Sequence, residues 1–197
     1  MGQSPSFAPN VKNVTGSQRD VQFSRIDSHY RERYQRLEQS GEGCYRLTSL
    51  GAWAASVPEH VYHFFQQLGL ERRQLLIDLG SGDGLVSCIA GLFTRSVGME
   101  IDRWLCHVAR QSISALGLDD RVAVICVDYL TQQIRRADCL YIYPDKPLNY
   151  LETFLGGWRG LLLVAGSHFP VDSFDPVQKL RCGLDELVAY QTRKTDQ

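Results

Sequence analysis

The chain has 197 residues, of which 44% are hydrophobic, and its formal net charge at pH 7 is −1. This length and composition suit one compact domain with a sizeable core. The near-neutral charge gives no strong signal for nucleic acid or an anionic membrane surface. No apolar run approaches the ~20 residues of a membrane span, and the N-terminus does not resemble a secretory signal. We therefore expect a cytoplasmic protein without a membrane span; the sequence leaves its oligomeric state open.

The cysteines and histidines show no metal-binding pattern. His60 and His63 lack a nearby cysteine or acidic partner, so we expect structural roles for both and no bound metal. The absence of a CxxC pair favours free, buried thiols in a reducing compartment over a disulfide framework or a zinc site. The six cysteines are Cys44, Cys88, Cys106, Cys126, Cys139 and Cys182.

The N-terminal part of the chain predicts two helices. Residues 1–19 are rich in Ser, Asn, Gln, Gly and Pro, so we expect a flexible segment there. Apolar residues at helical spacing predict a helix over about 21–39, which the glycines in 41–43 end. Residues 56–59 resemble a capping box with a proline in the first turn, and predict a second helix that stops at Gly69.

After this second helix, short apolar runs alternate with helical patterns. Such alternation predicts a doubly wound, mostly parallel Rossmann-like sheet, since parallel strands are buried on both faces. A turn at 183–185 between two more strands predicts a C-terminal antiparallel hairpin. We expect one α/β domain over 20–197, with a helical lid at about 20–55 and a core at about 56–197. The predicted strands are 74–79, 96–101, 122–127, 139–143, 160–165, 177–182 and 186–192, and helices are predicted to start near Gly84, Trp104 and Leu148.

A glycine-rich turn carries the strongest functional signal. The apolar strand that ends at Asp78 and Leu79 runs into Gly80-Ser81-Gly82-Asp83-Gly84 and then a helix. Glycines allow positive φ and a close approach of ligand to backbone, and the N–H groups of such a turn can bind a carboxylate.

Two ligand classes use a turn of this kind. A dinucleotide site has the spacing G-x-G-x-x-G, whereas here Leu85 stands where the third glycine belongs. The carboxylate of Asp78 would also repel a diphosphate, but it suits an ammonium or sulfonium group. The pattern therefore favours S-adenosylmethionine over a nicotinamide dinucleotide.

Acidic residues follow the next two strands. Glu100 can accept hydrogen bonds from both ribose hydroxyls, a device that dinucleotide sites share. Asp128 can accept from an adenine amino group or cap a helix, and these alternatives stay open. Tyr129 or Ile101 can lie against the adenine ring.

These motifs resemble those of a known superfamily. Residues 78–84 and 98–102 are similar to the first two motifs of class I S-adenosylmethionine-dependent methyltransferases, over about residues 55–192. The forms Gly-Ser-Gly-Asp-Gly and Val-Gly-Met-Glu-Ile-Asp also resemble the small lysine methyltransferases related to the ATP synthase c-subunit methyltransferase. That group has a basic residue where this chain has Leu85. The resemblance implies that S-adenosyl-L-methionine is bound by Asp78, Gly80, Ser81, Gly82, Gly84, Glu100, Ile101, Asp128 and Tyr129.

The acceptor side of the site is less determined by the sequence. Residues 143–147 read Tyr-Pro-Asp-Lys-Pro, unlike the Asn/Asp-Pro-Pro-aromatic motif of relatives that methylate a planar nitrogen. Tyr143 can present its ring to a cationic amine or fill the rim of the sheet. His168, after the fifth predicted strand, can accept a proton or pack in a loop. We expect Tyr143 and His168 to be catalytic and the acceptor to be an amine such as protein lysine, followed by a small molecule.

Three other functions remain open at this point. They are a NAD-dependent oxidoreductase, an aminopropyl transferase of the same fold, and a non-catalytic protein that binds S-adenosylmethionine but has lost the acceptor chemistry.

Overall fold

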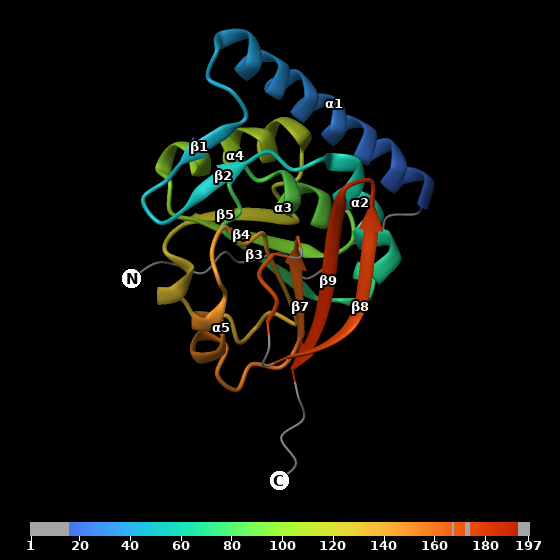
Figure 1. Cartoon of the computed structure of the whole chain (residues 1–197). Helices are drawn as coiled ribbons and strands as arrows, with labels where there is room; N and C mark the ends of the chain where they lie inside the picture. The colour runs from blue at the N-terminus through green and yellow to red at the C-terminus, as the bar shows by residue number, and fades with distance from the viewer. Residues whose placement is uncertain (1–15, 167, 172–173, 193–197) are drawn as a thin grey trace.

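The computed structural model in Figure 1 describes residues 16–166, 168–171 and 174–192. Its centre is a seven-stranded sheet in the order β5-β4-β3-β6-β7-β9-β8. The first five strands in this order are parallel, whereas β9 runs antiparallel to both β7 and β8. The strands are β3 (Leu75–Leu79), β4 (Arg95–Glu100), β5 (Val122–Cys126), β6 (Cys139–Ile142), β7 (Leu161–Ala165), β8 (Phe174–Cys182) and β9 (Asp185–Thr192).

Helices cover both faces of this sheet. One buried cluster joins residues of four helices to one face, and a second joins α5 to the other face. Leu140 and Tyr141, adjacent in β6, belong to opposite clusters, which explains why the parallel strands are continuously apolar. The helices are α1 (Gly16–Ser40), α2 (Pro58–Leu68), α3 (Leu85–Ala90), α4 (Arg103–Leu116) and α5 (Asn149–Phe154), with 3-10 turns at Leu70–Arg72 and Tyr129–Thr131.

The predicted architecture is confirmed, with shifts at some ends. Helix α1 begins at Gly16, earlier than expected, and ends before Gly41 at φ 79°. The predicted flexible segment therefore overlaps α1 at residues 16–19, and its remainder lies outside the described residues. The capping-box prediction is wrong: the residue before α2 is Val57, which makes no side-chain capping bond, and Pro58 begins the helix.

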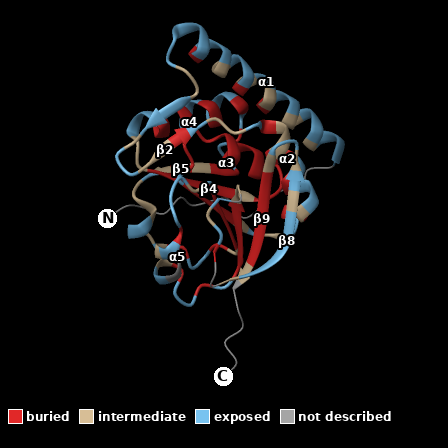
Figure 2. Ribbon diagram, viewed as in Figure 1, coloured by how far each residue is buried: buried red, intermediate tan, exposed pale blue. Residues whose placement is uncertain are grey.

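The two strands of the C-terminal hairpin differ in burial. Figure 2 shows β9 mostly buried and β8 largely exposed, consistent with the edge position of β8. The two-residue turn Gly183–Leu184 joins them, with φ 58° at Gly183. The predicted hairpin is thus present, although β8 begins earlier than expected.

All six cysteines are free, but the expectation that they are buried holds only in part. Cys88, Cys106 and Cys139 are buried, and Cys126 is exposed. In the part of the chain that the structure describes, each helix is too short or too polar to cross a bilayer.

A small hairpin precedes the sheet and was not predicted. It consists of β1 (Tyr45–Leu47) and β2 (Ala52–Ala54), which pair antiparallel. In Figure 1 this β1–β2 hairpin lies beyond the ends of the parallel strands, near α4. It is therefore placed to cover the edge of the sheet where the candidate site residues meet.

Candidate functional site

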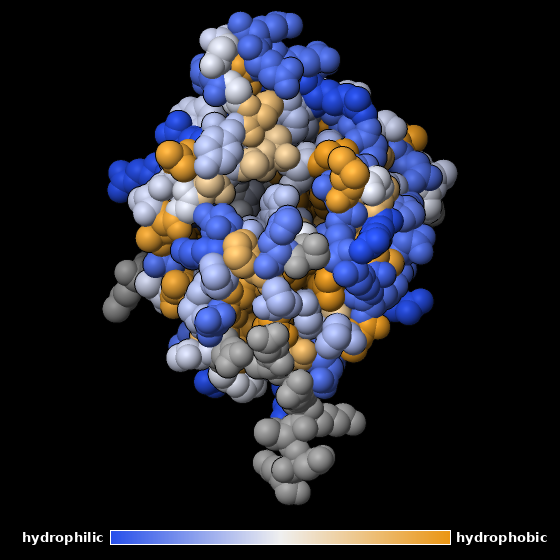
Figure 3. All heavy atoms as spheres, in the orientation of Figure 1, coloured by the Kyte–Doolittle hydropathy of each residue, from blue (hydrophilic) through white to orange (hydrophobic). Residues whose placement is uncertain are grey.

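Three adjoining cavities lie at the carboxyl ends of the parallel strands. The hairpin cavity is lined by Trp53, Gly80, Glu100, Tyr129 and Tyr143, among others. The turn cavity is lined by Trp53, Asp78, Gly80, Ser81 and Tyr143, among others. The α2 cavity is lined by His60, Phe64, Tyr141, Tyr143 and Asp185, among others. Figure 3 shows this face hollowed near its centre. Open α/β sheets bind ligands at this edge.

Backbone geometry explains the glycines of the turn after β3. Gly80, Gly82 and Gly84 have φ of 79°, 55° and 86°, a region that L side chains rarely adopt. Gly84 precedes the first turn of α3, and a Cβ there would come within 2.8 Å of Ala109 Cβ. The turn therefore needs glycine for its conformation and, at Gly84, for close packing against α4.

Three backbone N–H groups of this turn, which we expected to be available to a ligand, donate hydrogen bonds within the protein. Those of Gly80 and Ser81 donate to Met99 O at 2.9 and 3.1 Å, and that of Gly82 donates to Glu100 Oε2 at 2.8 Å. These three groups already have partners inside the protein, and binding of a ligand carboxylate by the turn stays a prediction. Ser81 lines the turn cavity, but its Oγ is buried beside Gly98 of β4 and has no hydrogen-bond partner.

Asp78 is an unusual carboxylate because it is 2% exposed at the end of β3. Ser87 Oγ donates a hydrogen bond of 2.8 Å to its Oδ2. Burial raises the pKa of Asp78 to about 7; the Ser87 bond opposes this shift, and the charges of Glu100 and Asp83 add to it. A cationic group that entered the turn cavity would stabilise the ionised form.

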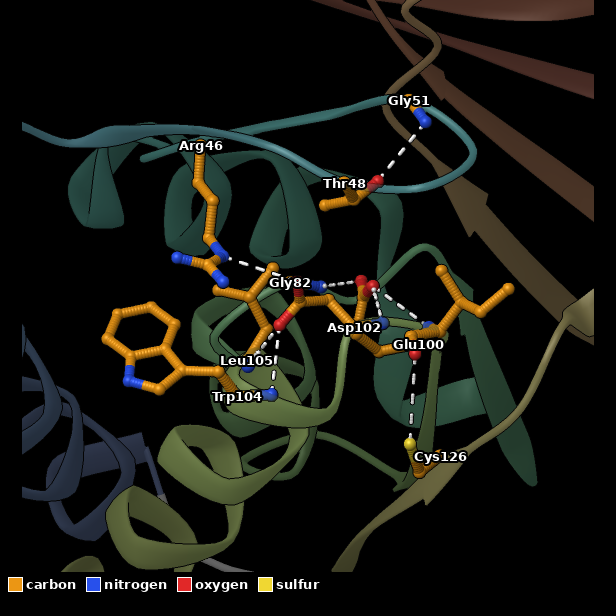
Figure 4. A network of polar contacts seen from close by, with 10 residues as sticks. Arg46, Thr48, Gly51, Gly82, Glu100, Asp102, Trp104, Leu105 and Cys126 are labelled. Atoms are coloured by element: carbon orange, nitrogen blue, oxygen red, sulfur yellow. Dashed lines mark hydrogen bonds and ion pairs between the residues drawn. The ribbon is translucent and has the colours of Figure 1, made fainter.

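Glu100 ends β4 with its carboxylate inside a ring of backbone donors. Oε2 accepts from Gly82 N–H, and Oε1 accepts from the N–H groups of Ile101 and Asp102 at 2.9 and 2.8 Å. Figure 4 shows this carboxylate between the glycine turn and the start of α4. A carboxylate has about four acceptor positions, so three backbone bonds leave room for about one further donor.

Asp128 and Tyr129 follow β5 and border the hairpin cavity together with Ile101. Asp128 caps the 3-10 turn, since its side chain accepts from Leu130 N–H at 2.9 Å. The hydroxyl groups of Tyr129 and Tyr150 lie 2.7 Å apart. The capping alternative for Asp128 is thus present, and the residue also lines the hairpin cavity.

The β1–β2 hairpin closes over the hairpin cavity through three polar contacts. Arg46 Nε lies 3.2 Å from Asp102 Oδ2, at the start of α4 (Figure 4). The N–H of Ala52 donates to Asp145 Oδ2 at 2.8 Å, and Lys146 Nζ donates to the carbonyl of Leu50 at 2.9 Å. The Asp-Lys pair after β6, which departs from the motif of planar-nitrogen methylases, therefore contacts the hairpin.

Helix α1 packs directly on the glycine turn. Arg33 Nε lies 3.5 Å from Oδ2 of the buried Asp83, and Tyr30 OH donates to the carbonyl of Asp83 at 3.0 Å. Burial raises the pKa of Asp83, and Arg33 opposes that shift. These contacts tie the N-terminal helix to the turn, so it is part of the site's support.

The two predicted catalytic residues are placed differently. Tyr143 is 55% exposed and lines all three cavities. His168 is exposed and lines none of the three cavities. Its neighbour Ser167 lies outside the described residues. The geometry thus brings Tyr143 to the centre of the site and leaves His168 at its periphery; the roles of both remain predictions.

Comparisons with known proteins agree with this architecture. The chain matches no protein-family model and no curated protein. It is similar to an RNA methyltransferase from Salinibacter ruber in complex with S-adenosyl-L-homocysteine, with TM-score 0.59 and 24% identity over 68% of this chain and 92% of that one. It is also similar to a methyltransferase from Geobacter sulfurreducens, with TM-score 0.62 and 17% identity over 90% of this chain and 99% of that one. The chain therefore has the fold of the class I methyltransferases.

Proposed function

We propose that this chain is an S-adenosylmethionine-dependent methyltransferase that acts on an amine. One observation carries the proposal: the glycine turn after β3 and Glu100 at the end of the neighbouring β4 are hydrogen-bonded to each other beside a covered cavity. The turn and Glu100 belong to the two sequence motifs at residues 78–84 and 98–102. The domain that carries them has the fold of known methyltransferases.

The hairpin cavity suits the adenosine portion. Glu100 has acceptor capacity left for a ribose hydroxyl, and Asp128 can accept from the adenine amino group. Tyr129 and Ile101 supply apolar surface for the ring.

The turn cavity suits the methionine portion. Asp78 and Ser81 both line it, and the carboxylate of Asp78 suits an ammonium group. The turn cavity therefore fits the ammonium end of such a ligand.

A dinucleotide fits less well. Leu85, at the position of the third glycine, is 2% exposed and forms part of the core where α3 begins. The third glycine of a dinucleotide site permits close helix–strand packing. The buried carboxylates of Asp78 and Asp83 near the turn also disfavour a diphosphate.

Methyl transfer requires mainly that the protein positions the two reactants. When bound, S-adenosylmethionine supplies an electrophilic methyl group on a sulfonium sulfur. Glu100 holds its ribose and Asp78 its ammonium group, the β1–β2 hairpin excludes water, and Tyr143 presents a π face to a cationic acceptor. An amine acceptor must lose a proton before it reacts, which requires a base or water nearby.

The test combines binding with turnover. Titration calorimetry should show saturable binding of S-adenosylmethionine and S-adenosylhomocysteine, and none of NAD⁺. Turnover is then followed as S-adenosylhomocysteine release with a lysine peptide, n-butylamine or RNA. Binding without turnover on any acceptor would indicate a binding protein, and turnover on RNA alone would overturn the amine assignment. Binding of NAD⁺ alone would end the proposal.

A further inference from the structure

His60 and Asp185 form a pair that the sequence did not suggest. His60 Nδ1 and Asp185 Oδ2 lie 2.7 Å apart, although 125 positions separate the two residues. His60 lies in the first turn of α2 and Asp185 is the first residue of β9, so packing of α2 beside the C-terminal hairpin brings them together. Both side chains line the α2 cavity.

The α2 cavity adjoins the turn cavity. Ser56, Tyr141 and Tyr143 line both, and the ring of Tyr143 also reaches the end of β7, since a Cβ on Gly166 would lie 3.5 Å from its Cε2. A group that enters the α2 cavity therefore approaches the glycine turn at Tyr143. The second reactant of a group transfer has to meet the first at such a junction.

The pair selects the tautomer of the neutral imidazole. An ionised carboxylate only accepts hydrogen bonds, so in the neutral ring Nδ1–H donates to Asp185 and Nε2 carries the lone pair. The Nε2 edge lies beside Gly183: a Cβ at Gly183 would come within 3.2 Å of Nε2. Glycine at this position leaves open the space beside Nε2 that a side chain would fill.

We propose that the α2 cavity is the acceptor site, that it takes a primary amine on an alkyl chain, and that His60 is its general base. In the step assigned to His60, an N–H bond of the incoming ammonium breaks and its electron pair stays on nitrogen. The proton bonds to Nε2 and later leaves to water. Asp185 is the positioning residue that holds the ring and its tautomer. This inference rests on the proposed function.

The lining of the cavity supports an amine. Val57, Val61 and Phe64 give an apolar wall for an alkyl stem, and Tyr141 and Tyr143 present aromatic rings to a cation. The described lining residues include no lysine or arginine, so nothing there favours an anionic acceptor.

One acidic lining residue has its own partners. Lys179 Nζ and Arg181 Nε lie 2.7 and 2.9 Å from the carboxylate oxygens of Glu186. Asp185 is therefore the carboxylate that remains to attract an ammonium group, next to His60.

Histidine NMR of the protein without S-adenosylmethionine tests the site directly. The Nε2 resonance of His60 should have the shift of an unprotonated nitrogen, and Asp185→Asn should change the tautomer. Titration with n-butylamine or Nα-acetyl-lysine amide should move the His60 signals saturably, whereas p-cresol should not. A response to n-butylamine alone points to a small amine, and tighter binding of the lysine derivative points to a protein side chain. Unmoved His60 signals, or movement only with p-cresol, would overturn the proposal.

A matched pair of variants separates this inference from the proposed function. His63 lies on the same helix but is exposed. His60→Gln should lower turnover about 10²- to 10⁴-fold, the usual contribution of a general base, with S-adenosylmethionine affinity within about twofold of the parent. His63→Gln should leave both unchanged. A His60→Gln protein with parental turnover would disprove the role of His60 while leaving methyltransferase activity itself established.

Discussion

The indole of Trp53 lies directly over Gly82. A Cβ at Gly82 would overlap Cδ1 of that ring, so the glycine provides the space into which the β1–β2 hairpin inserts its only tryptophan. Trp53 is 9% exposed and packs with Leu37 of α1 and Leu105 of α4. From sequence, we attributed the glycines of the turn to positive φ and to a close approach of ligand to backbone. In the structure, a Cβ at Gly82 would meet the hairpin.

Gly82→Ala should therefore open the hairpin. Displacing Trp53 should raise hydrogen exchange of the amides in β1 and β2 and weaken S-adenosylmethionine binding at least tenfold. Gly80→Ala is the matched control, because Gly80 also has positive φ but a Cβ there meets no protein atom within 4 Å. Both variants carry backbone strain of about 1–3 kcal/mol, but only Gly82→Ala should speed exchange in the hairpin.

A double-mutant cycle checks the cause. In a Trp53→Ala background the overlap is gone, so Gly82→Ala should cost less stability there than in the parent protein. Equal costs in both backgrounds would show that backbone strain alone, without the Trp53 contact, explains the glycine.

Glu100→Ala should lower both stability and cofactor affinity. The variant leaves three backbone N–H groups without their acceptor, and loss of a charge-assisted bond to ribose should weaken binding by about 1.5–3 kcal/mol, roughly ten- to a hundredfold. Asp138→Ala is the control, since Asp138 accepts from the N–H groups of Gln74 and Leu75 at the opposite end of β3. Calorimetry and thermal unfolding should show a stability loss in both variants and an affinity loss only in Glu100→Ala.

Much of the fold could be predicted because local signals agree with it. Apolar runs mark the buried strands, and glycines mark where helices end, as at Gly41 and Gly69, both with positive φ. The prediction of a capping box was wrong although residues 56–59 have the expected pattern. In the structure, Val57 and not Ser56 directly precedes the helix. Sequence patterns locate such ends only within a few residues.

The site was harder to predict where it depends on distant contacts. The sequence pointed to Glu100 and the glycine turn because each follows an apolar strand. The segment 45–54 has no clear period, so its pairing became visible only in the structure. The partners Asp145 and His60 looked unremarkable in sequence because their roles come from residues 93 and 125 positions away.

Removing the carboxylate of Asp145 should loosen the hairpin without unfolding the domain. Asp145→Ala deletes the acceptor for Ala52 N–H, so exchange of that amide should become several-fold faster. Because the bond is exposed, we expect a small change in melting temperature. Lys179→Ala, which removes an ion pair on β8, is the control and should leave exchange at Ala52 unchanged. Unaltered exchange in Asp145→Ala would mean that Trp53, Arg46 and Lys146 hold the hairpin without Asp145.

Asp78 should make both stability and ligand binding depend on pH. Its pKa of about 7 in the folded protein lies above the ordinary value of 3.8, because burial disfavours the charged form. Between these values the folded state holds a proton that the unfolded chain has released, so stability should fall as pH rises from about 4 to about 7 and then level off. Denaturation across this range should show a smaller decline in Asp78→Asn than in the parent, whereas the exposed Asp119→Asn should behave like the parent. An ammonium group beside Asp78 favours its ionised form, so S-adenosylmethionine affinity should increase with pH through about 7 in the parent and stay flat in Asp78→Asn. If the parent's affinity is instead constant over that range, the methionine portion does not contact Asp78.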